Sequence, residues 1–365
     1  MVADAALPRL IDQTRDSIRA WLASLGEEAY RAEQIHRGIL RLTPISQMSD
    51  LPRGLRVSLA EAFTEGYPVP ARWIEGEGEG ADRFLFTLPD GEAVESVRIG
   101  PLEDYTACLS TQVGCGLRCA FCASGKFGLT RNLSVGEIVG QVLALRAQTA
   151  TATGLEGWPS RLVYMGMGEP FQNYSAVLES IKRLTDPTGP GLGARRITLS
   201  TAGMVPEIYR FAEEGLQVGL AVSLHAPNSE LRRSLMPIEE IYPLKTLLRA
   251  CQTYIEKSGR RLTFEYILLK GVNDSPAEAK GLVDLFRNWS LVHINLIRYN
   301  PIGLTRLEAP KESDARAFVK RLVDGGLDAT LRKSPGRNID AACGQLRGLE
   351  YEKAGVRIQP AAMAP

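Results

Sequence analysis

The sequence has few histidines, few aromatic residues and no long apolar run. Of 365 residues only three are His and 7% are aromatic, and the charged residues nearly cancel to a formal net charge of +1. A membrane-spanning helix needs about 20 consecutive apolar residues, which occur nowhere in the chain. The first residues also lack the apolar segment of a secretion signal. These absences argue against a membrane-anchored or secreted protein, so we expect a cytoplasmic protein without a membrane partner.

The remaining composition is that of an ordinary globular protein. Hydrophobic residues make up 44% of the chain and charged residues 23%, which excludes disordered, collagen-like and coiled-coil chains. The near-zero net charge argues weakly against a nucleic-acid partner. That average hides an asymmetry, because residues 1–98 carry 11 Arg or Lys and 16 Asp or Glu, whereas the rest carry 32 and 26. A basic C-terminal part is compatible with RNA binding.

The cysteines are unevenly placed. Six are present, and four of them fall within fifteen residues, at positions 108, 115, 119, 122, 251 and 343. A secreted disulfide scaffold would be shorter and would spread its cysteines evenly. In a cytosolic chain, this clustering indicates metal binding or catalysis.

Hydrophobic periodicity predicts a small helical domain followed by an α/β domain. Helices are expected at 9–24, 27–42 and 52–64, and the Asp90-Gly91 pair predicts a β-hairpin. From residue 106 onward, apolar strands alternate with helices, which is typical of parallel strands and a partial or complete barrel. The expected parts are a helical domain (1–75), a β-rich connector (76–98), the barrel core (99–345) and a tail (346–365). Strands are expected at 107–113, 161–167, 196–201, 218–226, 262–271, 292–300 and about 329–333, and helices at 134–148, 174–185, 205–215, 243–257, 276–288 and 312–324.

Short polar or glycine-rich segments follow the predicted strands. Five of them are GCGLRC, GEP, STAG, SLH and YNP, at residues 114–119, 168–170, 200–203, 223–225 and 299–301. In a βα barrel, the loops at the C-terminal ends of the strands form one common mouth, where active sites lie. We therefore expect these five segments to converge.

Three of the cysteines form a C-x3-C-x2-C loop, Cys115, Cys119 and Cys122. Three thiolates on one loop can each bind one iron of a cubane cluster, and no fourth cysteine is near enough in sequence to close the site. The alternative is a zinc site whose fourth ligand comes from His36, His225 or Cys343. Structural zinc prefers paired C-x2-C knuckles, and this loop has a single such pair, so an iron–sulfur cluster with one open iron is favoured.

The loop, together with the strings MGMGEP, TLSTAGMVP, VSLHAPN and IDAACGQLRG, resembles the RlmN/Cfr family of radical S-adenosylmethionine (SAM) adenine methyltransferases. The resemblance runs from about Glu95 to Arg347, and it is closer to the RlmN branch. It implies a partial (β/α)6 radical SAM barrel with a helical N-terminal accessory domain. It also implies that Cys115, Cys119 and Cys122 hold a [4Fe-4S] cluster whose open iron chelates SAM. The implied SAM-binding residues are Gly168, Glu169, Ser200, Ser223, Leu224, His225 and Asn300.

The same resemblance assigns three catalytic residues. Cys343 matches the cysteine that the family methylates from a first SAM, Cys108 matches its resolving partner, and Glu95 matches the proposed general base. C2 of adenine is an electrophilic carbon, so a polar methyl transfer from SAM is not available there, and a radical formed on the methylthio group of Cys343 can add to the ring instead. Cys251 matches nothing and is expected in the core.

The resemblance further implies an enzyme that methylates C2 of an adenosine in the peptidyl-transferase centre of 23S rRNA and the adenosine 3′ of the anticodon in some tRNAs. It would use two SAM molecules per turnover, a reducing electron donor and a monomeric chain. One alternative is C8 methylation, which confers antibiotic resistance, and another is a non-catalytic iron–sulfur or zinc RNA-binding module. Glu239 and Glu240 replace the family's Asn and basic residue, which puts RNA contacts at that loop in doubt. Residues expected to meet phosphates are Lys126, Arg131, Asn132, Arg195, Arg196, Arg332, Lys333 and Arg337.

Overall fold

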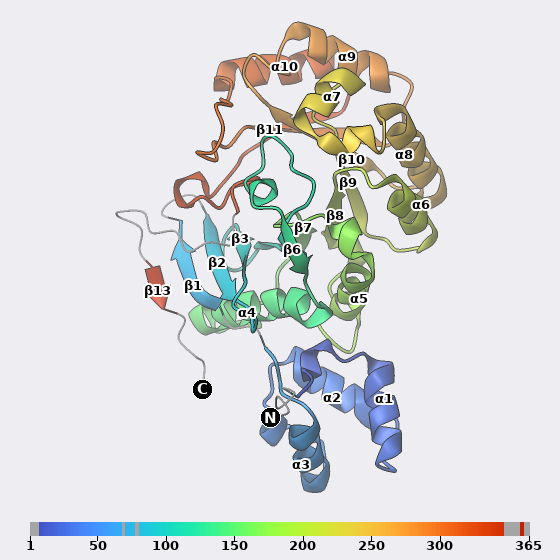
Figure 1. The fold of residues 1–365 in the computed structure, drawn as a ribbon, viewed down its shortest axis with the longest axis vertical. Coiled ribbons are helices and arrows are strands. Elements are labelled where there is room, and N and C mark those ends of the chain that lie inside the picture. The colour runs from blue at the N-terminus through green and yellow to red at the C-terminus, as the bar shows by residue number, and fades with distance from the viewer. Residues whose placement is uncertain (1–6, 68–69, 77–79, 347–357, 361–365) are drawn as a thin grey trace, which may run out of the picture.

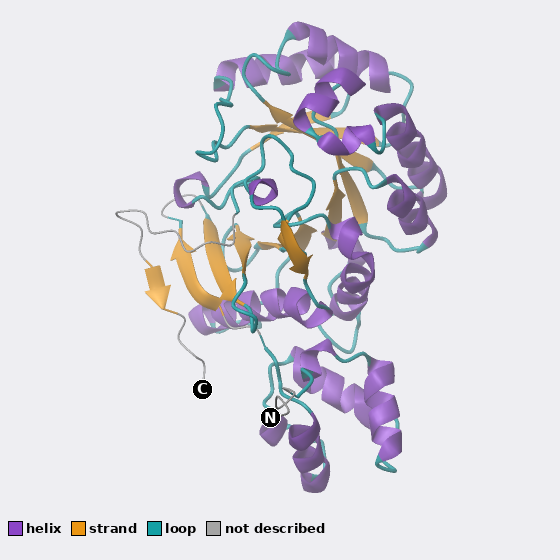
Figure 2. Cartoon of the chain, viewed as in Figure 1, coloured by secondary structure: helices purple, strands orange, loops and turns teal. Residues whose placement is uncertain are grey.

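The computed structural model describes residues 7–67, 70–76, 80–346 and 358–360. Two parts are visible: a barrel-like body of strands covered by helices, and a smaller all-helical lobe attached at one end of it (Figures 1 and 2). In the described part, no helix is both long and apolar enough to cross a membrane.

The lobe comprises residues 7–67, and its helices agree with the predicted periodicity except at the start. The predicted helix 9–24 is interrupted, because Thr14 caps the second segment by accepting a hydrogen bond from the Ser17 amide at 3.0 Å. Buried Ile and Leu side chains at helical spacing fill the core of the lobe. Its elements are η1 (Leu10–Asp12), α1 (Arg15–Ser24), α2 (Arg31–Leu40), η2 (Ile45–Gln47) and α3 (Arg53–Ala62).

The predicted β-rich connector forms an antiparallel meander. Strands β1 (Pro70–Glu75), β2 (Ala81–Thr87) and β3 (Ala93–Ile99) pair in sequence, and the β2–β3 turn contains Asp90-Gly91, with Gly91 at φ +85°. The hairpin prediction is confirmed. Strand β1 also pairs with β13 (Ile358–Pro360). Because β1 starts at Pro70, the sheet begins earlier than the expected connector, and the expected division into domains stays a prediction.

The α/β prediction is confirmed in the body of the molecule. One open sheet runs in the order β12-β11-β10-β9-β8-β7-β4-β3-β2-β1-β13, so the meander continues the barrel sheet through an antiparallel β3–β4 pair. The strands from β4 to β12 in this order are parallel, and the sheet does not close. They are β4 (Thr106–Cys108), β7 (Arg161–Tyr164), β8 (Ile197–Thr201), β9 (Gly219–Ser223), β10 (Leu262–Leu268), β11 (Val292–Arg298) and β12 (Ala329–Arg332).

The predicted strand 107–113 is wrong in one respect, because the chain leaves the barrel sheet after β4. It re-forms as β5 (Gln112–Gly114), which pairs with β6 (Leu129–Asn132) in a separate two-stranded sheet. Loop amides between the two strands bond elsewhere: Thr111 donates to the Met167 carbonyl at 2.9 Å. The β5–β6 pair then carries the cysteine loop away from the barrel wall.

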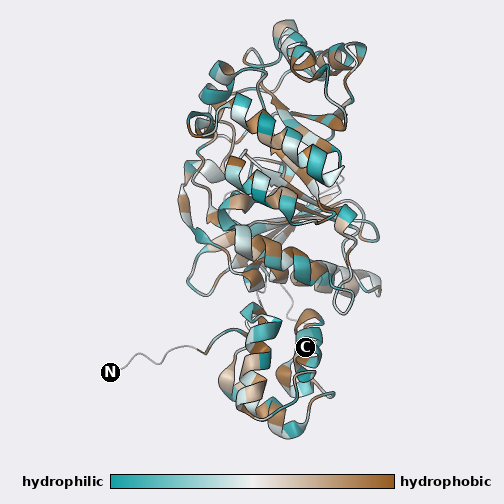
Figure 3. Ribbon diagram, turned by 90° about the vertical axis from the view of Figure 1, so that its right-hand side faces the viewer, coloured by the Kyte–Doolittle hydropathy of each residue, from teal (hydrophilic) through white to brown (hydrophobic). Residues whose placement is uncertain are grey.

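Helices cover the outer face of the barrel, and Figure 3 shows hydrophilic and hydrophobic residues alternating around them, as amphipathic helices require. The longest, α4, begins at a capping box formed by Ser134 and Glu137. The short helix α7, not expected from the sequence, follows the SLHAPN segment. The helices are α4 (Val135–Thr153), α5 (Tyr174–Thr185), α6 (Val205–Glu213), α7 (Ser229–Leu235), α8 (Leu244–Ser258), α9 (Pro276–Phe286) and α10 (Glu312–Asp324), with 3-10 turns η3 (Ser124–Lys126), η4 (Pro170–Asn173), η5 (Ala194–Arg196), η6 (Pro237–Glu240) and η7 (Arg337–Ile339).

Candidate active site

The cysteine loop lies between β5 and η3. Where it leaves β5, the chain passes close to Gly128, and this close approach depends on Gly114. The Cys115 amide donates to the Gly128 carbonyl at 2.7 Å, and Gly114 has φ +76°. A Cβ at Gly114 would lie 2.0 Å from the Gly128 oxygen, so a side chain does not fit there. A second bond, from the Ala120 amide to the Leu235 carbonyl at 2.9 Å, holds the loop against α7.

All three loop cysteines line one cavity of about 170 Å³ at the C-terminal ends of the barrel strands. The same cavity is lined by most of the residues predicted to bind SAM, so the expected convergence of strand ends is observed for four of the five segments. The predicted residues present in the lining are Cys115, Cys119, Cys122, Gly168, Glu169, Ser200, Ser223, His225 and Cys343.

The chemistry of the loop thiols fits the binding of a metal cluster. Burial raises the pKa of Cys115 to about 12 and that of Cys119 well above its usual value, and the neighbouring cysteines act in the same direction. Such thiols become thiolates when a metal compensates their charge. Among the described residues, no set of three or more His, Cys, Asp or Glu side chains is arranged to hold a single ion. The spread of the three cysteines around one cavity instead matches a cluster, in which each thiolate binds a different iron.

Glu169 is the carboxylate of this cavity. It is buried, and its oxygens accept bonds from the Phe171 amide at 3.1 Å and the Ala202 amide at 2.7 Å. Burial raises its pKa to about 7, while these amides oppose the shift. The preceding Gly168, at φ +98°, lets the chain turn against Gln112. A carboxylate so placed is suited to the ammonium group of SAM.

His225 enters the cavity in a strained backbone conformation. Its φ is +58°, uncommon for a residue with a side chain, and its Nδ1 accepts a bond from the Ile267 amide at 3.0 Å. Burial, and then Arg232, lower its pKa to about 3, so the ring is neutral at physiological pH. Because Nδ1 accepts, the proton resides on Nε2, and His225 presents a hydrogen-bond donor.

Two residues predicted to bind SAM do not line the cavity. Leu224 is fully buried, and its amide donates to the Glu265 carbonyl at 3.0 Å. Asn300 donates from Nδ2 to the Cys343 carbonyl at 3.1 Å, and its Oδ1 accepts from Arg337 Nε at 2.7 Å. In this structure Asn300 therefore fixes the segment that carries Cys343.

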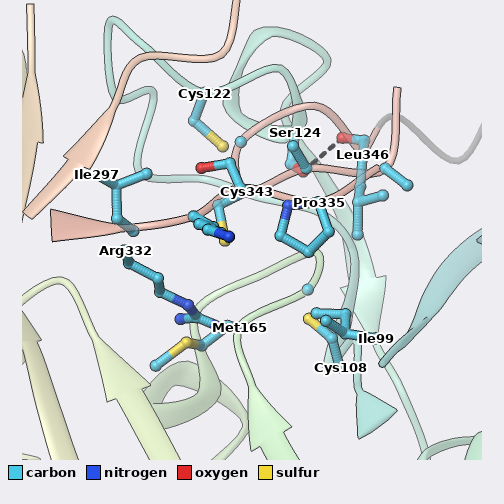
Figure 4. A pocket seen from close by; sticks show the side chains of 16 residues that line it. Ile99, Cys108, Cys122, Ser124, Met165, Ile297, Arg332, Pro335, Cys343 and Leu346 are labelled. Atoms are coloured by element: carbon cyan, nitrogen blue, oxygen red, sulfur yellow. Dashed lines mark hydrogen bonds between the residues drawn. The ribbon is translucent and has the colours of Figure 1, made fainter. Parts of the chain in front are cut away.

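A second, smaller cavity of about 80 Å³ contains the two cysteines predicted to be catalytic. Cys108, at the end of β4, and Cys343, after η7, both line it, and Figure 4 shows Cys343 between Cys108 on one side and Cys122 on the other. Cys122 and Cys343 line both cavities, so the two spaces adjoin. Both thiols are free, and burial raises the pKa of Cys108 to about 12.

The Cys343 segment is attached directly to the cysteine loop. The Ala123 amide donates to the Gly344 carbonyl at 2.7 Å, and the Ser124 hydroxyl donates to the Leu346 carbonyl at 2.7 Å, which is the dashed line in Figure 4. These two bonds join parts of the chain about 220 residues apart. The position of Cys343 is thus coupled to that of the cluster loop.

Glu95 lies apart from both cavities. It is buried on β3, its carboxylate pairs with Arg83 at 3.2 Å, and its carbonyl accepts from the Ser110 hydroxyl at 2.6 Å. Its strand does reach the site: Val97, two residues along, is paired with Cys108. Glu95 is thus on a strand that neighbours Cys108, but its side chain lines neither of the two cavities.

Sequence reasoning missed Glu265 as a site residue and expected Arg332 to meet a phosphate, whereas the structure places both at the cavities of the site. Glu265, on β10, lines the larger cavity, and both of its oxygens accept from Asn295 Nδ2, at 2.8 and 3.0 Å. Burial raises its pKa. Arg332 extends from β12 into the smaller cavity. The available signal for Glu265 was a single acidic residue inside the apolar run LTFEYILL.

Glu239, one of the two acidic residues that put RNA contacts at this loop in doubt, has a structural role. Glu239 is fully buried and pairs with Arg232 at 2.7 Å, while its other oxygen accepts from the Leu244 amide at 2.8 Å. Arg232 also donates to the Ala202 carbonyl at 2.7 Å. The pair therefore supports the strand ends of the site from behind. Glu240 is exposed.

Apart from Arg332, the residues expected to meet phosphates divide into two groups. Arg131 pairs with Glu137 at 2.8 Å and with Asp90, Asn132 bonds to Gln172, and Arg337 bonds to Asn300, so these side chains are engaged within the protein. Lys126, Arg195, Arg196 and Lys333 are exposed. Cys251 is fully buried in α8, as predicted.

Comparisons with known proteins agree with this site. Residues 109–280 match the model of the Radical SAM superfamily, and residues 9–64 match the Ribosomal RNA large subunit methyltransferase N-terminal domain. A relative in Thermoanaerobacter sp. (strain X514), named "Probable dual-specificity RNA methyltransferase RlmN", is 43% identical over 93% of this chain and 97% of its own. A relative of the same name in Dictyoglomus thermophilum is 44% identical over 94% and 97%.

A solved structure gives the same result for the fold. The crystal structure of a radical SAM methyltransferase from Sphaerobacter thermophilus superimposes with a TM-score of 0.88, at 42% identity, and covers 94% of this chain and all of the other. Radical SAM enzymes use a [4Fe-4S] cluster and SAM, and the three loop cysteines and the cavity beside them fit that pair. The chain belongs to the RlmN family of radical SAM RNA methyltransferases.

Proposed function

We propose that this enzyme methylates C2 of an adenosine in the peptidyl-transferase centre of 23S rRNA, and C2 of the adenosine 3′ of the anticodon in some tRNAs, with two SAM molecules per turnover. The observation that carries the proposal is the adjoining pair of cavities, in which Cys108 and Cys343 share one space and Cys343 shares the other with the cluster cysteines. A cysteine so placed has access both to SAM and to a resolving thiol. The names of the relatives support two classes of RNA substrate.

The larger cavity is the proposed binding site of the cofactors. Cys115, Cys119 and Cys122 would hold the cluster, and Glu169 would accept from the ammonium group of SAM, while Ser200, Ser223 and the Nε2–H of neutral His225 would meet its ribose and adenine. When bound, SAM supplies a methyl group for one step and, with an electron from the cluster, a 5′-deoxyadenosyl radical for the next.

Cys343 is the proposed methyl carrier. Its thiol loses a proton, and the resulting thiolate takes the methyl group of the first SAM, so that an S–CH3 bond forms at Cys343 and S-adenosylhomocysteine leaves. Loss of a hydrogen atom from that methyl, which the 5′-deoxyadenosyl radical would take up, leaves a carbon radical that forms a C–C bond to C2 of the adenine. Removal of one electron, which the oxidised cluster would accept, and of the C2 proton then restores the aromatic ring, with the nucleotide still linked to Cys343 through the methylene carbon.

Cys108 is the proposed resolving residue. Its thiolate attacks the sulfur of Cys343, so that an S–S bond forms and the S–CH2 bond breaks. The released carbon takes up a proton and becomes the methyl group of the product, and an external thiol must reduce the disulfide before the next turnover. The proposed role of Glu95 as the base for the C2 proton rests on the family resemblance alone, since its carboxylate pairs with Arg83.

The proposal extends to the oligomeric state, the cellular compartment and the source of electrons. We propose a monomeric enzyme that acts in the cytoplasm and receives electrons from a reducing donor. The decisive measurement is mass spectrometry of nucleosides from 23S rRNA and tRNA after reaction with the anaerobically reconstituted enzyme. The proposal requires 2-methyladenosine in both RNAs. Appearance of 8-methyladenosine instead would move the enzyme to the C8 branch of the family, and methylation of rRNA alone would remove the tRNA part.

A further inference from the structure

A small basic cleft lies between the helical lobe and the barrel, away from the active site. It has a volume of about 130 Å³. It is lined by Arg37 and Leu40 of α2, by Arg41 directly after that helix, and by Arg146, Glu156, Trp158 and residues 188–190. We call it the arginine cleft. A water molecule has a share of about 30 Å³ in the liquid, so the cleft has room for a few waters or one small anionic group.

Two of the three arginines have no partner among the described residues. Arg37 lies in the last turn of α2 and Arg41 directly follows that helix, four residues on, and their side chains make no hydrogen bond or ion pair with any residue that the structure describes. The other arginines at this domain boundary differ. Arg15 pairs with Glu33 at 2.9 Å and with Asp186, and Arg183 donates to the Ile11 carbonyl at 2.7 Å. Arg37 and Arg41 are therefore not used to attach the lobe.

The third arginine is held in a fixed orientation. Arg146 Nε donates to the Glu156 carbonyl at 2.9 Å, and its guanidinium stacks over the ring of Trp158 at 4.5 Å. These two contacts occupy the Nε–H and one face of the Arg146 guanidinium. Its terminal nitrogens make no hydrogen bond to a described residue. Arg146 thus presents oriented donors beside two unpaired guanidinium groups, and one exposed carboxylate, that of Glu156, is near.

We propose that the arginine cleft binds a phosphodiester group of the RNA substrate, at a distance from the base that is modified. Guanidinium forks match phosphate oxygens in a bidentate geometry, and RNA duplexes are recognised mainly through phosphates and 2′-hydroxyls. The lobe, residues 7–67, carries eight Arg and eight Asp or Glu, so an arginine pair without a carboxylate partner among the described residues leaves a local positive charge that an anion would neutralise. The inference rests on the proposed function, because it takes RNA as the substrate.

The test measures RNA affinity of the reconstituted enzyme as a function of salt concentration, with a 23S rRNA fragment and a tRNA as probes. The double variant Arg37→Gln/Arg41→Gln should bind both RNAs about tenfold more weakly, and the slope of log affinity against log salt should fall by about one to two. Cleavage of SAM under reducing conditions without RNA should be unchanged. The matched control is Lys245→Gln/Arg249→Gln, which removes two exposed charges at the same spacing on α8, on the opposite end of the molecule (Figure 1).

Failure of the arginine-cleft proposal can be distinguished from failure of the proposed methyltransferase function. Unchanged affinity and slope in the double variant, or an equal loss in the α8 control, overturn the cleft proposal while methylation by the wild-type enzyme leaves the proposed function intact. If inorganic phosphate protects Arg37 and Arg41 from a guanidinium-modifying dicarbonyl but RNA does not, the cleft is a free-anion site and the proposal is wrong. Protection by an acidic protein segment alone would have the same consequence.

Discussion

At the scale of single residues, the environment of each cysteine decides its chemistry. Cys251 is fully buried in α8 and lines neither cavity of the site, whereas Cys108 and Cys343 share one. Burial raises the pKa of all three thiols, so acidity does not separate them. What distinguishes Cys108 and Cys343 from Cys251 is that they line the same cavity. A resolving thiol needs this shared cavity to reach the sulfur that carries the methyl group.

Substitution of the two cavity cysteines should therefore give different products. Cys343→Ala removes the carrier, so neither methylated RNA nor a protein–RNA adduct should form. Cys108→Ala removes the resolving thiol, so a covalent adduct should accumulate, visible as a species that resists denaturing electrophoresis and is sensitive to ribonuclease. Cys251→Ala is the control, with full activity and a stability loss of about 1 kcal/mol. An adduct in Cys343→Ala, or full turnover in Cys108→Ala, would contradict the proposed roles.

The sequence alone predicts site residues well when they lie close together in the chain. Cys115, Cys119 and Cys122 lie on one loop, so their convergence needs no knowledge of the fold. The role of Glu239 was not predictable in this way, because its meaning depends on burial beside Arg232. Glu265 was missed for a related reason: a charged residue within an apolar strand is informative only once the strand is known to face a cavity.

At the scale of elements, the cysteine loop depends on the β5–β6 pair. The ladder shifts register between Val113 and Gly114, and the Cys115 amide is bonded to Gly128 directly after the shift. Gly114 therefore occupies a point where a left-handed backbone and a close approach of two chains coincide. This pair was not predicted, since the segment ACLSTQV at 107–113 indicates one strand, and the departure of Thr111 toward Met167 is a tertiary effect.

We expect Gly114→Ala to prevent correct assembly of the cluster site. The new Cβ would lie 2.0 Å from the Gly128 oxygen, so the two strands must separate and Cys115 must move. Iron and sulfide content after anaerobic reconstitution should fall severalfold, and SAM cleavage with it.

Gly154→Ala is the matched control for this prediction. Gly154 has nearly the same φ, +73°, at the end of α4, but a Cβ there meets no atom within 4 Å. It should cost about 1 kcal/mol of stability and leave the iron content unchanged. Equal iron content in the two variants would mean that the close contact at Gly114 does not shape the loop.

At the scale of the whole molecule, the lobe is attached to the barrel through η1. Arg183 of α5 donates to the carbonyls of Ile11 at 2.7 Å and Gln13 at 2.8 Å, and the Asp12 carboxylate accepts from the Gly136 amide at 2.8 Å, at the N-terminus of α4. A Cβ at Gly136 would approach Asp12 to 2.5 Å, so the glycine permits this contact. The residues involved are distant in sequence, which is why periodicity predicted the helices but not their attachment.

Arg183→Met should loosen the lobe without unfolding the barrel. The substitution keeps most of the buried aliphatic volume but leaves two carbonyls without a charged donor, at a cost of about 3 kcal/mol. Hydrogen exchange followed by mass spectrometry should show faster exchange in residues 7–67 and unchanged exchange in the strands from β7 to β11. In Arg19→Gln, which removes two ion pairs at the lobe surface, with Asp16 and Glu33, protection should change by less than about 0.5 kcal/mol. Uniform loss of protection in Arg183→Met would show instead that lobe and barrel unfold as one cooperative unit.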